Sequence, residues 1–279
     1  MLGGRRRQHV LQKVLIGLRL SSNTEARREA PAHRSRQDQE PRLQSLEDYL
    51  RQPELARFPF LFIVTYGRSG STLLQGLLNA LPGYHIRGEN NAALVPLFRT
   101  QRRLRHTRSE WGNEATTPGS PWYGAELIEP DMFVAGCADA FFRSVLRPSI
   151  GARCCGFKEI RYDRRTLSDG DFVPYLRFLR RAFPGAAFVF NFRNVEDTLK
   201  SGWWPDYEPG DAERAISIMR TRMGDYARDH AEHSFSFDYD AVCRDHSYFA
   251  ELCAFLGEEY DPEMVERVMS TSHSIGGSQ

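Results

Sequence analysis

Short apolar runs alternate with longer amphipathic stretches along this chain. The runs at residues 60–65, 85–87, 154–160, 186–192 and 234–238 predict strands. Helices are predicted at residues 71–81, 131–146, 171–183, 195–203, 212–230, 247–256 and 262–269, with a further helix within residues 43–55. Strands that alternate with helices favour a parallel sheet, because each crossover lays a helix on one face of the sheet. The pattern therefore predicts an α/β three-layer sandwich, with a central parallel sheet and helices on both faces.

Residues 1–45 lie outside this alternation. They are polar apart from the run 10–20, which contains Lys13 and Arg19 and is shorter than the roughly 20 residues needed to span a bilayer. We predict a flexible basic N-terminal arm over residues 1–45 and one folded domain over residues 46–279. A surface helix, a docking segment and a signal-like start are the alternatives for the run 10–20.

The segment at about 99–130 is the least regular part of the predicted domain. It carries Trp111, Trp122 and Tyr123 among Gly, Pro, Thr and Ser residues. Long irregular segments are typical of lids and binding loops, where aromatic side chains stack on a substrate. We predict a variable substrate loop here, with an exposed insertion as the alternative.

Composition and charge restrict the possible partners. The 279 residues carry a formal net charge of +1, which gives no general attraction to nucleic acid or acidic membranes. We predict no nucleic-acid partner, no stable membrane span and a cytoplasmic location, and the oligomeric state stays open. Five cysteines without paired metal spacing argue against a disulfide framework or a zinc site, and no metal is predicted. Cys154 and Cys155 are neighbours on one predicted strand, so they face opposite sides of the sheet as buried thiols.

The first predicted strand leads into a Gly- and Ser-rich turn and then into a helix. The turn reads Gly67-Arg68-Ser69-Gly70-Ser71-Thr72. Its glycines allow backbone N–H groups to converge on an anion, and the start of the helix adds unpaired donors and the positive end of its dipole. This turn predicts a phosphate-binding loop, or P-loop, in which Arg68 supplies a fixed positive charge. Loops that bind nucleoside triphosphates end in Gly-Lys-Ser/Thr, and the absence of that lysine favours a ligand other than Mg·ATP.

The run Tyr66-Gly67-Arg68-Ser69-Gly70-Ser71-Thr72 resembles the donor-binding loop of sulfotransferases that use 3′-phosphoadenosine-5′-phosphosulfate (PAPS). A second part of the resemblance follows the strand 186–192, where Arg193 and Ser201 match the family's spacing. The resemblance implies that Gly67, Arg68, Ser69, Gly70, Ser71 and Thr72 bind the donor and that Arg193 and Ser201 hold its 3′-phosphate. The eight residues from Arg193 to Ser201 span about 12 Å of ideal helix, so Arg193 must precede the helix and reach back.

Two further residues acquire roles from the same resemblance. Gly88-Glu89 resembles a segment of tyrosylprotein and several bacterial sulfotransferases, which implies that Glu89 is the general base for the acceptor hydroxyl. His85 is the alternative base. Lys158 lies near the end of the strand 154–160, and the resemblance implies that it offsets charge on the sulfuryl group and the bridging oxygen. A salt bridge with Glu159 or another neighbour is the alternative for Lys158.

The ends of the predicted strands bring these residues together. Ligands of open parallel sheets bind at the carboxyl ends of the strands, where Arg68, Glu89, Lys158 and Arg193 are all expected. We expect the Trp203-Trp204 pair near the acceptor, and the resemblance implies donor contacts from Ser272 and Ser274.

The resemblance, over about residues 60–269, implies in-line transfer of a sulfuryl group from PAPS to a hydroxyl acceptor, with 3′-phosphoadenosine-5′-phosphate (PAP) as product. Its catalytic residues are then Glu89, Lys158 and Arg68. A small molecule, a carbohydrate and a peptidyl hydroxyl are all compatible acceptors. The alternatives are a P-loop kinase of small molecules and a non-catalytic binding protein of the same fold.

Overall fold

Five parallel strands form the centre of the structure, a computed structural model that describes residues 43, 45–113, 117–208 and 210–271. The strands are β1 (Phe60–Val64), β2 (Tyr84–Arg87), β3 (Cys154–Glu159), β4 (Ala186–Phe192) and β5 (Ser234–Asp238), in the order β2-β3-β1-β4-β5. All four neighbouring pairs are parallel. All five predicted strands are therefore confirmed. The predicted arm over residues 1–45 lies outside the described residues except at residues 43 and 45.

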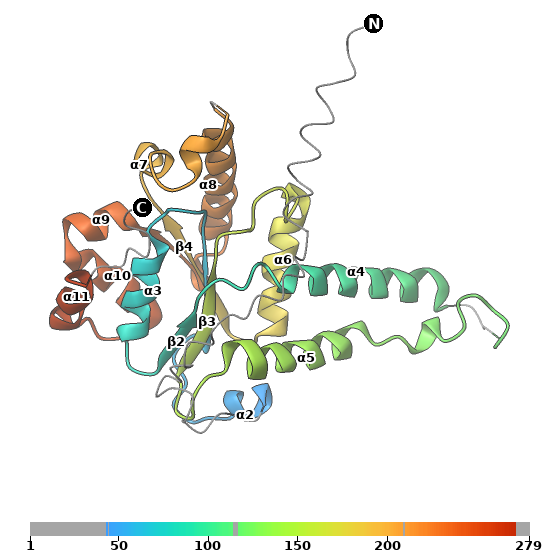
Figure 1. The fold of residues 1–279 in the computed structure, drawn as a ribbon. Coiled ribbons are helices and arrows are strands. Elements are labelled where there is room, and N and C mark those ends of the chain that lie inside the picture. The colour runs from blue at the N-terminus through green and yellow to red at the C-terminus, as the bar shows by residue number, and fades with distance from the viewer. Residues whose placement is uncertain (1–42, 44, 114–116, 209, 272–279) are drawn as a thin grey trace, which may run out of the picture. The chain divides into compact units, whose positions relative to one another are not determined.

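Helices cover both faces of this sheet (Figure 1). On one face lie α3 (Ser71–Ala80), α9 (Tyr239–Arg244), α10 (Phe249–Leu256) and α11 (Pro262–Met269). On the other lie α2 (Leu46–Leu50), α4 (Leu94–Trp111), α5 (Pro130–Phe141), α6 (Asp169–Ala182) and α8 (Asp211–Asp229). The short helix α7 (Val195–Leu199) follows β4. The predicted α/β three-layer sandwich is confirmed.

Side chains alternate between two hydrophobic cores along the central strands β1, β3 and β4. In β1, Phe60 and Phe62 face the α6 core while Leu61 and Ile63 face the α3 core, and all four are fully buried. The neighbouring cysteines of β3 divide in the same way, since Cys155 belongs to the first core and Cys154 to the second. Both are free thiols, and burial raises the pKa of each well above its ordinary value. The prediction of two buried thiols on opposite faces is confirmed.

The structure corrects the expected irregularity at about 99–130. Its first part belongs to α4, whose buried residues Leu94, Val95, Phe98 and Gln101 recur at helical spacing. Long polar side chains on the other face obscured this pattern in the sequence. Trp111, at the end of α4, stacks on Trp122 with ring centroids 3.8 Å apart. These two rings contact each other, and neither lies in the wall of the cavity that contains Arg68, Lys158 and Arg193.

Two other predicted boundaries differ. The helix expected at 195–203 is α7, which ends at Leu199, so the chain turns back before Ser201. The helix expected at 131–146 ends as an α-helix at Phe141, and residues Phe142–Leu146 continue as one turn of π-helix. No helix in the described residues is long and apolar enough to cross a membrane.

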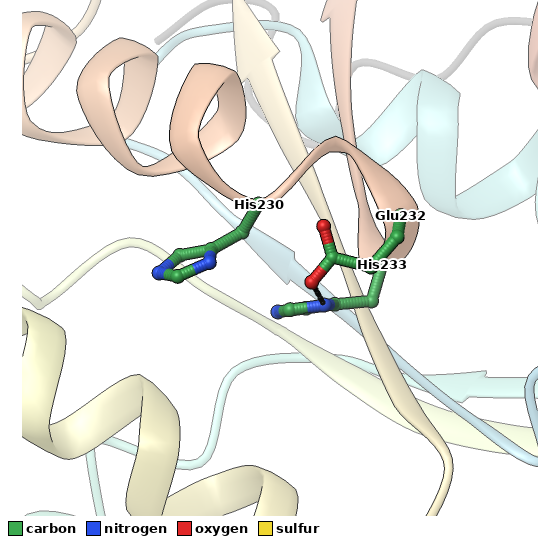
Figure 2. Close-up of side chains that lie close together, drawn as sticks. All are labelled: His230, Glu232 and His233. Carbon is green, nitrogen blue, oxygen red and sulfur yellow. Dashed lines mark ion pairs between the residues drawn. The ribbon is translucent and has the colours of Figure 1, made fainter.

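The junction between α8 and β5 lies at the amino end of β5, and so opposite the carboxyl ends of the parallel strands. Figure 2 shows the side chains of His230, Glu232 and His233 at this junction. His233 is buried there, with only 4 % of its surface exposed. Its Nδ1 lies 2.7 Å from Oε1 of Glu232, and its Nε2 lies 3.2 Å from the hydroxyl of Tyr226 on α8. Burial and the nearby Arg180 lower the pKa of His233, while Glu232 opposes that shift. The neutral imidazole is thus the form that fits this junction.

Candidate active site

The loop between β1 and α3 is fixed by buried polar residues. Thr65 and Asn191 follow the apolar cores of β1 and β4, and both are fully buried. The Thr65 hydroxyl donates to the Asn191 carbonyl at 2.6 Å and lies 2.8 Å from the Ser69 hydroxyl. The Asn191 side-chain amide donates to the Ser69 carbonyl at 2.7 Å. The loop backbone is therefore held in one conformation by the strand ends beneath it.

Two glycines of this loop are required by close neighbours. A Cβ at Gly67 would lie 2.3 Å from the indole ring of Trp203, and a Cβ at Gly70 would lie 2.1 Å from the ring of Tyr239. Gly70 also has a φ of 78° and precedes α3 without any side-chain cap. The first N–H groups of α3 therefore face the cavity without a side-chain acceptor, which suits an anionic ligand.

Arg68 of the first motif contacts two residues of the second, which lie 125 and 133 residues later in the chain. It adopts a φ of 66°, which is uncommon for a residue with a side chain. Its Nε donates to Ser201 Oγ at 2.9 Å, and its carbonyl accepts from Arg193 Nη1 at 3.0 Å. Arg193 precedes α7, as the spacing required, and Arg68 connects it with Ser201.

Arg193 is held from several sides. The Tyr66 hydroxyl lies 3.1 Å from both its backbone nitrogen and its carbonyl oxygen, and Arg220 donates to that carbonyl at 2.9 Å. Its guanidinium lies over the ring of Tyr239 at 5.0 Å. Its Nε is buried and finds no hydrogen-bond acceptor among the described residues. A buried donor without a partner is costly, so this nitrogen suits a ligand oxygen.

Glu89 and Lys158 form an ion pair at the carboxyl edge of the sheet. Lys158 Nζ donates to Glu89 Oε1 at 2.7 Å, with 9 % of the lysine side chain and 31 % of the glutamate side chain exposed. The salt bridge that the sequence left as an alternative for Lys158 thus forms with Glu89, and Glu159 points elsewhere. The two residues expected to act on the acceptor and on the leaving oxygen are direct neighbours.

Glu159 is a site residue that the sequence reasoning missed. Its carboxylate is fully buried and accepts four backbone N–H groups, from Asn90 at 3.3 Å, Ala92 at 2.7 Å, Ile160 at 2.9 Å and Arg161 at 3.1 Å. These bonds join the segment after Glu89 to the segment after β3. An acidic residue inside the apolar run 154–160 was the available signal, because a buried carboxylate needs several donors.

One cavity of about 560 Å³ contains most of the predicted site residues in its wall, and the set comprises Arg68, Gly70, Ser71, Thr72, Glu89, Lys158 and Arg193. Gly67, Ser69 and Ser201 are not part of this wall: Gly67 lies against the indole ring of Trp203, Ser69 bonds to Thr65, and Ser201 accepts from Arg68. His85 is outside the cavity lining, and its Nε2 lies 3.3 Å from the Ser149 hydroxyl. Ser272 and Ser274 lie outside the described residues.

A match to the sulfotransferase family covers residues 59–262, which include every residue of this cavity except Met269. The chain belongs to the sulfotransferase family. The predicted family and enzyme class are thereby confirmed. No curated protein matches this sulfotransferase.

Solved structures include similar folds. The sulfotransferase domain of an olefin synthase from Synechococcus PCC 7002 is 19 % identical with a TM-score of 0.49, over 80 % of this chain and 81 % of that domain. A sulfotransferase from Mycobacterium avium is 14 % identical with a TM-score of 0.40, over 80 % and 69 % of the two chains. Retinol dehydratase in complex with androsterone and PAP is 12 % identical with a TM-score of 0.37, over 79 % and 65 %.

Proposed function

We propose that this sulfotransferase moves a sulfuryl group from PAPS to a hydroxyl acceptor by in-line displacement, with Glu89 as general base. The observation that carries the proposal is the convergence of Arg68, Glu89, Lys158 and Arg193 on one cavity beside the uncapped start of α3. These residues come from four separate segments, and the sheet brings their strand ends to one edge.

The residues of the cavity fit a donor with two anionic ends. The start of α3 offers backbone N–H groups at one place, and Arg193 offers the unpaired Nε at another. Arg68 holds Ser201 beside Arg193, because its Nε donates to Ser201 Oγ at 2.9 Å and its carbonyl accepts from Arg193 at 3.0 Å. Arg193 and Ser201 would hold the 3′-phosphate, and the loop from Gly67 to Thr72 would hold the 5′-phosphosulfate.

The transfer moves one proton and replaces one S–O bond by another. Glu89 removes the proton of the acceptor hydroxyl, whose oxygen then forms a bond to sulfur while the bond from sulfur to the bridging oxygen breaks. Lys158 and Arg68 offset the negative charge on the leaving and transferring oxygens. An ammonium has three donors, so Lys158 can keep its bond to Glu89 and still donate to the leaving oxygen.

Calorimetric titration with PAP, and separately with Mg·ATP, tests the donor class. We expect PAP to bind and Arg193→Ala to weaken that binding by about 1.5–3 kcal/mol, the value of a hydrogen bond to a charged group. Arg103→Ala is the matched control, because Arg103 is exposed on α4 and outside the cavity. Unchanged PAP affinity in Arg193→Ala would contradict the assigned 3′-phosphate site.

The same titration separates the other two functions. Preference for Mg·ATP over PAP would favour the kinase, although this loop lacks the lysine that triphosphate loops use. Tight PAP binding without sulfuryl transfer to a broad acceptor panel would favour a binding protein of the same fold.

A further inference from the structure

A second and larger cavity adjoins the first. Its volume is about 930 Å³, near the upper end for small-molecule sites. Ile160 and Trp203 line both cavities, and Asn91 and Ala92, two and three residues after Glu89, line the second. A molecule in this second cavity therefore lies beside the cavity that contains the catalytic pair, and Gly67 of the phosphate-binding loop lies in its wall. This is where an acceptor would lie, and the inference that follows rests on the proposed function.

The wall of the second cavity carries an excess of positive charge. Five arginines and two aspartates line it, although the whole chain has a formal net charge of only +1. The arginines are Arg99, Arg161, Arg164, Arg165 and Arg214. They come from α4, from the segment after β3 and from α8. Three separate segments thus place guanidinium groups around one space.

The aspartates do not neutralise this wall. Asp211 pairs with Arg214, and Arg164 pairs with Asp169, so these two arginines have carboxylate partners. The other aspartate, Asp163, uses its Oδ1 to accept the backbone N–H groups of Arg165 at 3.0 Å and Thr166 at 3.1 Å. Its carboxylate therefore stabilises a turn rather than an arginine side chain.

Three arginines remain without a carboxylate among the described residues. Arg99 donates to the Thr166 carbonyl at 2.7 Å, which orients it but leaves its charge uncompensated. The Arg165 guanidinium lies 6.0 Å from the ring centre of Tyr207. The exposed Arg161 side chain makes no hydrogen bond or ion pair within the described part of the chain. Guanidinium groups of this kind are matched in geometry to carboxylate and phosphate oxygens.

The remainder of the wall is aromatic and apolar. Trp203 is 44 % exposed, and Trp204 and Tyr207 lie beside it with Ile218 and Met219 of α8. Such a wall accommodates a flat or apolar body, while the arginines accommodate an anionic group. We propose that the acceptor of this sulfotransferase is an anion, a molecule that carries a carboxylate or phosphate group in addition to the hydroxyl that receives the sulfuryl group.

Three matched probes test whether the second cavity prefers an anionic acceptor. A hydroxynaphthoate, the corresponding neutral hydroxynaphthamide and the corresponding hydroxynaphthyl phosphate have the same ring and hydroxyl, and they differ in the charged group. Their binding to the PAP-saturated protein is measured by calorimetry, and their sulfation by PAP release. We expect both anions to bind at least about tenfold more tightly than the amide, the equivalent of one charge-assisted hydrogen bond. The tighter anion identifies the group as carboxylate or phosphate.

Variants connect this preference with the wall. The double variant Arg161→Gln, Arg165→Gln should lose about five- to tenfold in affinity for the anions, with the amide and PAP unaffected, because neither arginine lines the donor cavity. Arg103→Gln, which removes an exposed charge elsewhere, should change none of the four affinities. Added salt should weaken anion binding more in the wild type than in the double variant.

Three results would overturn the inference. Equal binding of amide and anions would remove the charge preference, and an equal loss for all probes in the double variant would make the arginines structural. Loss of PAP affinity in the double variant would assign these arginines to the donor. Failure of the wild type to bind PAP would be a different result, since it would reject the proposed function and the inference together.

Discussion

Replacing Glu159 by glutamine tests whether this buried carboxylate positions Glu89 by binding the segment that follows it. One oxygen accepts from Asn90 and Ala92, and the other from Ile160 and Arg161, at 2.7–3.3 Å. The amide of glutamine would turn its NH2 group toward one of these pairs and leave two backbone N–H groups without an acceptor. Each lost bond to a charged acceptor costs about 1.5–3 kcal/mol, so we expect a loss of about 3–6 kcal/mol.

This loss is a large part of the roughly 5–15 kcal/mol by which a domain is stable, so urea unfolding followed by circular dichroism will resolve it. Glu129→Gln is the matched control, because Glu129 pairs with Arg108 at 3.2 Å with about half of each side chain exposed, and it should lose no more than about 1 kcal/mol. In the fraction that stays folded, turnover should fall while PAP affinity remains, since Arg68 and Arg193 lie outside the segment after Glu89 that Glu159 binds. A stability within about 1 kcal/mol of wild type, together with unchanged turnover, would refute this reasoning.

Two further predictions concern the general base and the effect of pH. Glu89→Gln should keep PAP affinity and lose at least about a hundredfold in turnover, because an amide cannot remove the proton of the acceptor hydroxyl. Unchanged turnover would exclude Glu89 as the base. His233 has a lowered pKa in the folded protein, so the unfolded chain binds a proton first as pH falls. The contribution of neutral His233 to the free energy of unfolding is complete above the pKa of about 6.5 that His has in the unfolded chain. It is lost as the pH falls through that value toward the lower pKa of the folded protein. Urea unfolding at pH 7.5 and 5.5 should show a smaller pH effect in His233→Gln than in the wild type, and an equal effect would contradict the prediction.

The strands and the turn between β1 and α3 could be predicted because their causes are local. Continuous apolar runs such as Phe60–Val64 are buried on both faces of a parallel sheet, and Gly70 meets a positive φ that glycine adopts at low cost. Arg193 could be placed because it directly follows a strand. The helix α4 could not, since its buried positions are few among many arginines and polar residues.

Contacts between distant segments were beyond prediction. The family resemblance paired Arg193 with Ser201, but the structure connects each of them to Arg68. The Arg68 carbonyl accepts from Arg193 Nη1 at 3.0 Å, and Arg68 Nε donates to Ser201 Oγ at 2.9 Å. It considered Glu159 as a partner for Lys158, but alternation along β3 sends their side chains in opposite directions, and Lys158 meets Glu89. Such pairings depend on how loops from non-neighbouring parts of the chain lie over the sheet, which periodicity does not encode.

A common arrangement at the ends of the central strands explains how the site keeps its geometry. Thr65, Glu159 and Asn191 come at or just after the ends of β1, β3 and β4, and all three are polar and fully buried. Each bonds to a loop that carries a cavity residue. In the loop of Arg68, Thr65 bonds to the Ser69 hydroxyl and Asn191 donates to the Ser69 carbonyl, while Glu159 accepts from the backbone of the segment after Glu89. Because breaking a hydrogen bond of a buried polar group is costly, these bonds restrict the loops to one conformation before any ligand arrives. Substitution of the three buried residues should therefore act mainly through loop geometry and stability, whereas substitution of Arg193 or Arg161 should act mainly through the affinity for a ligand.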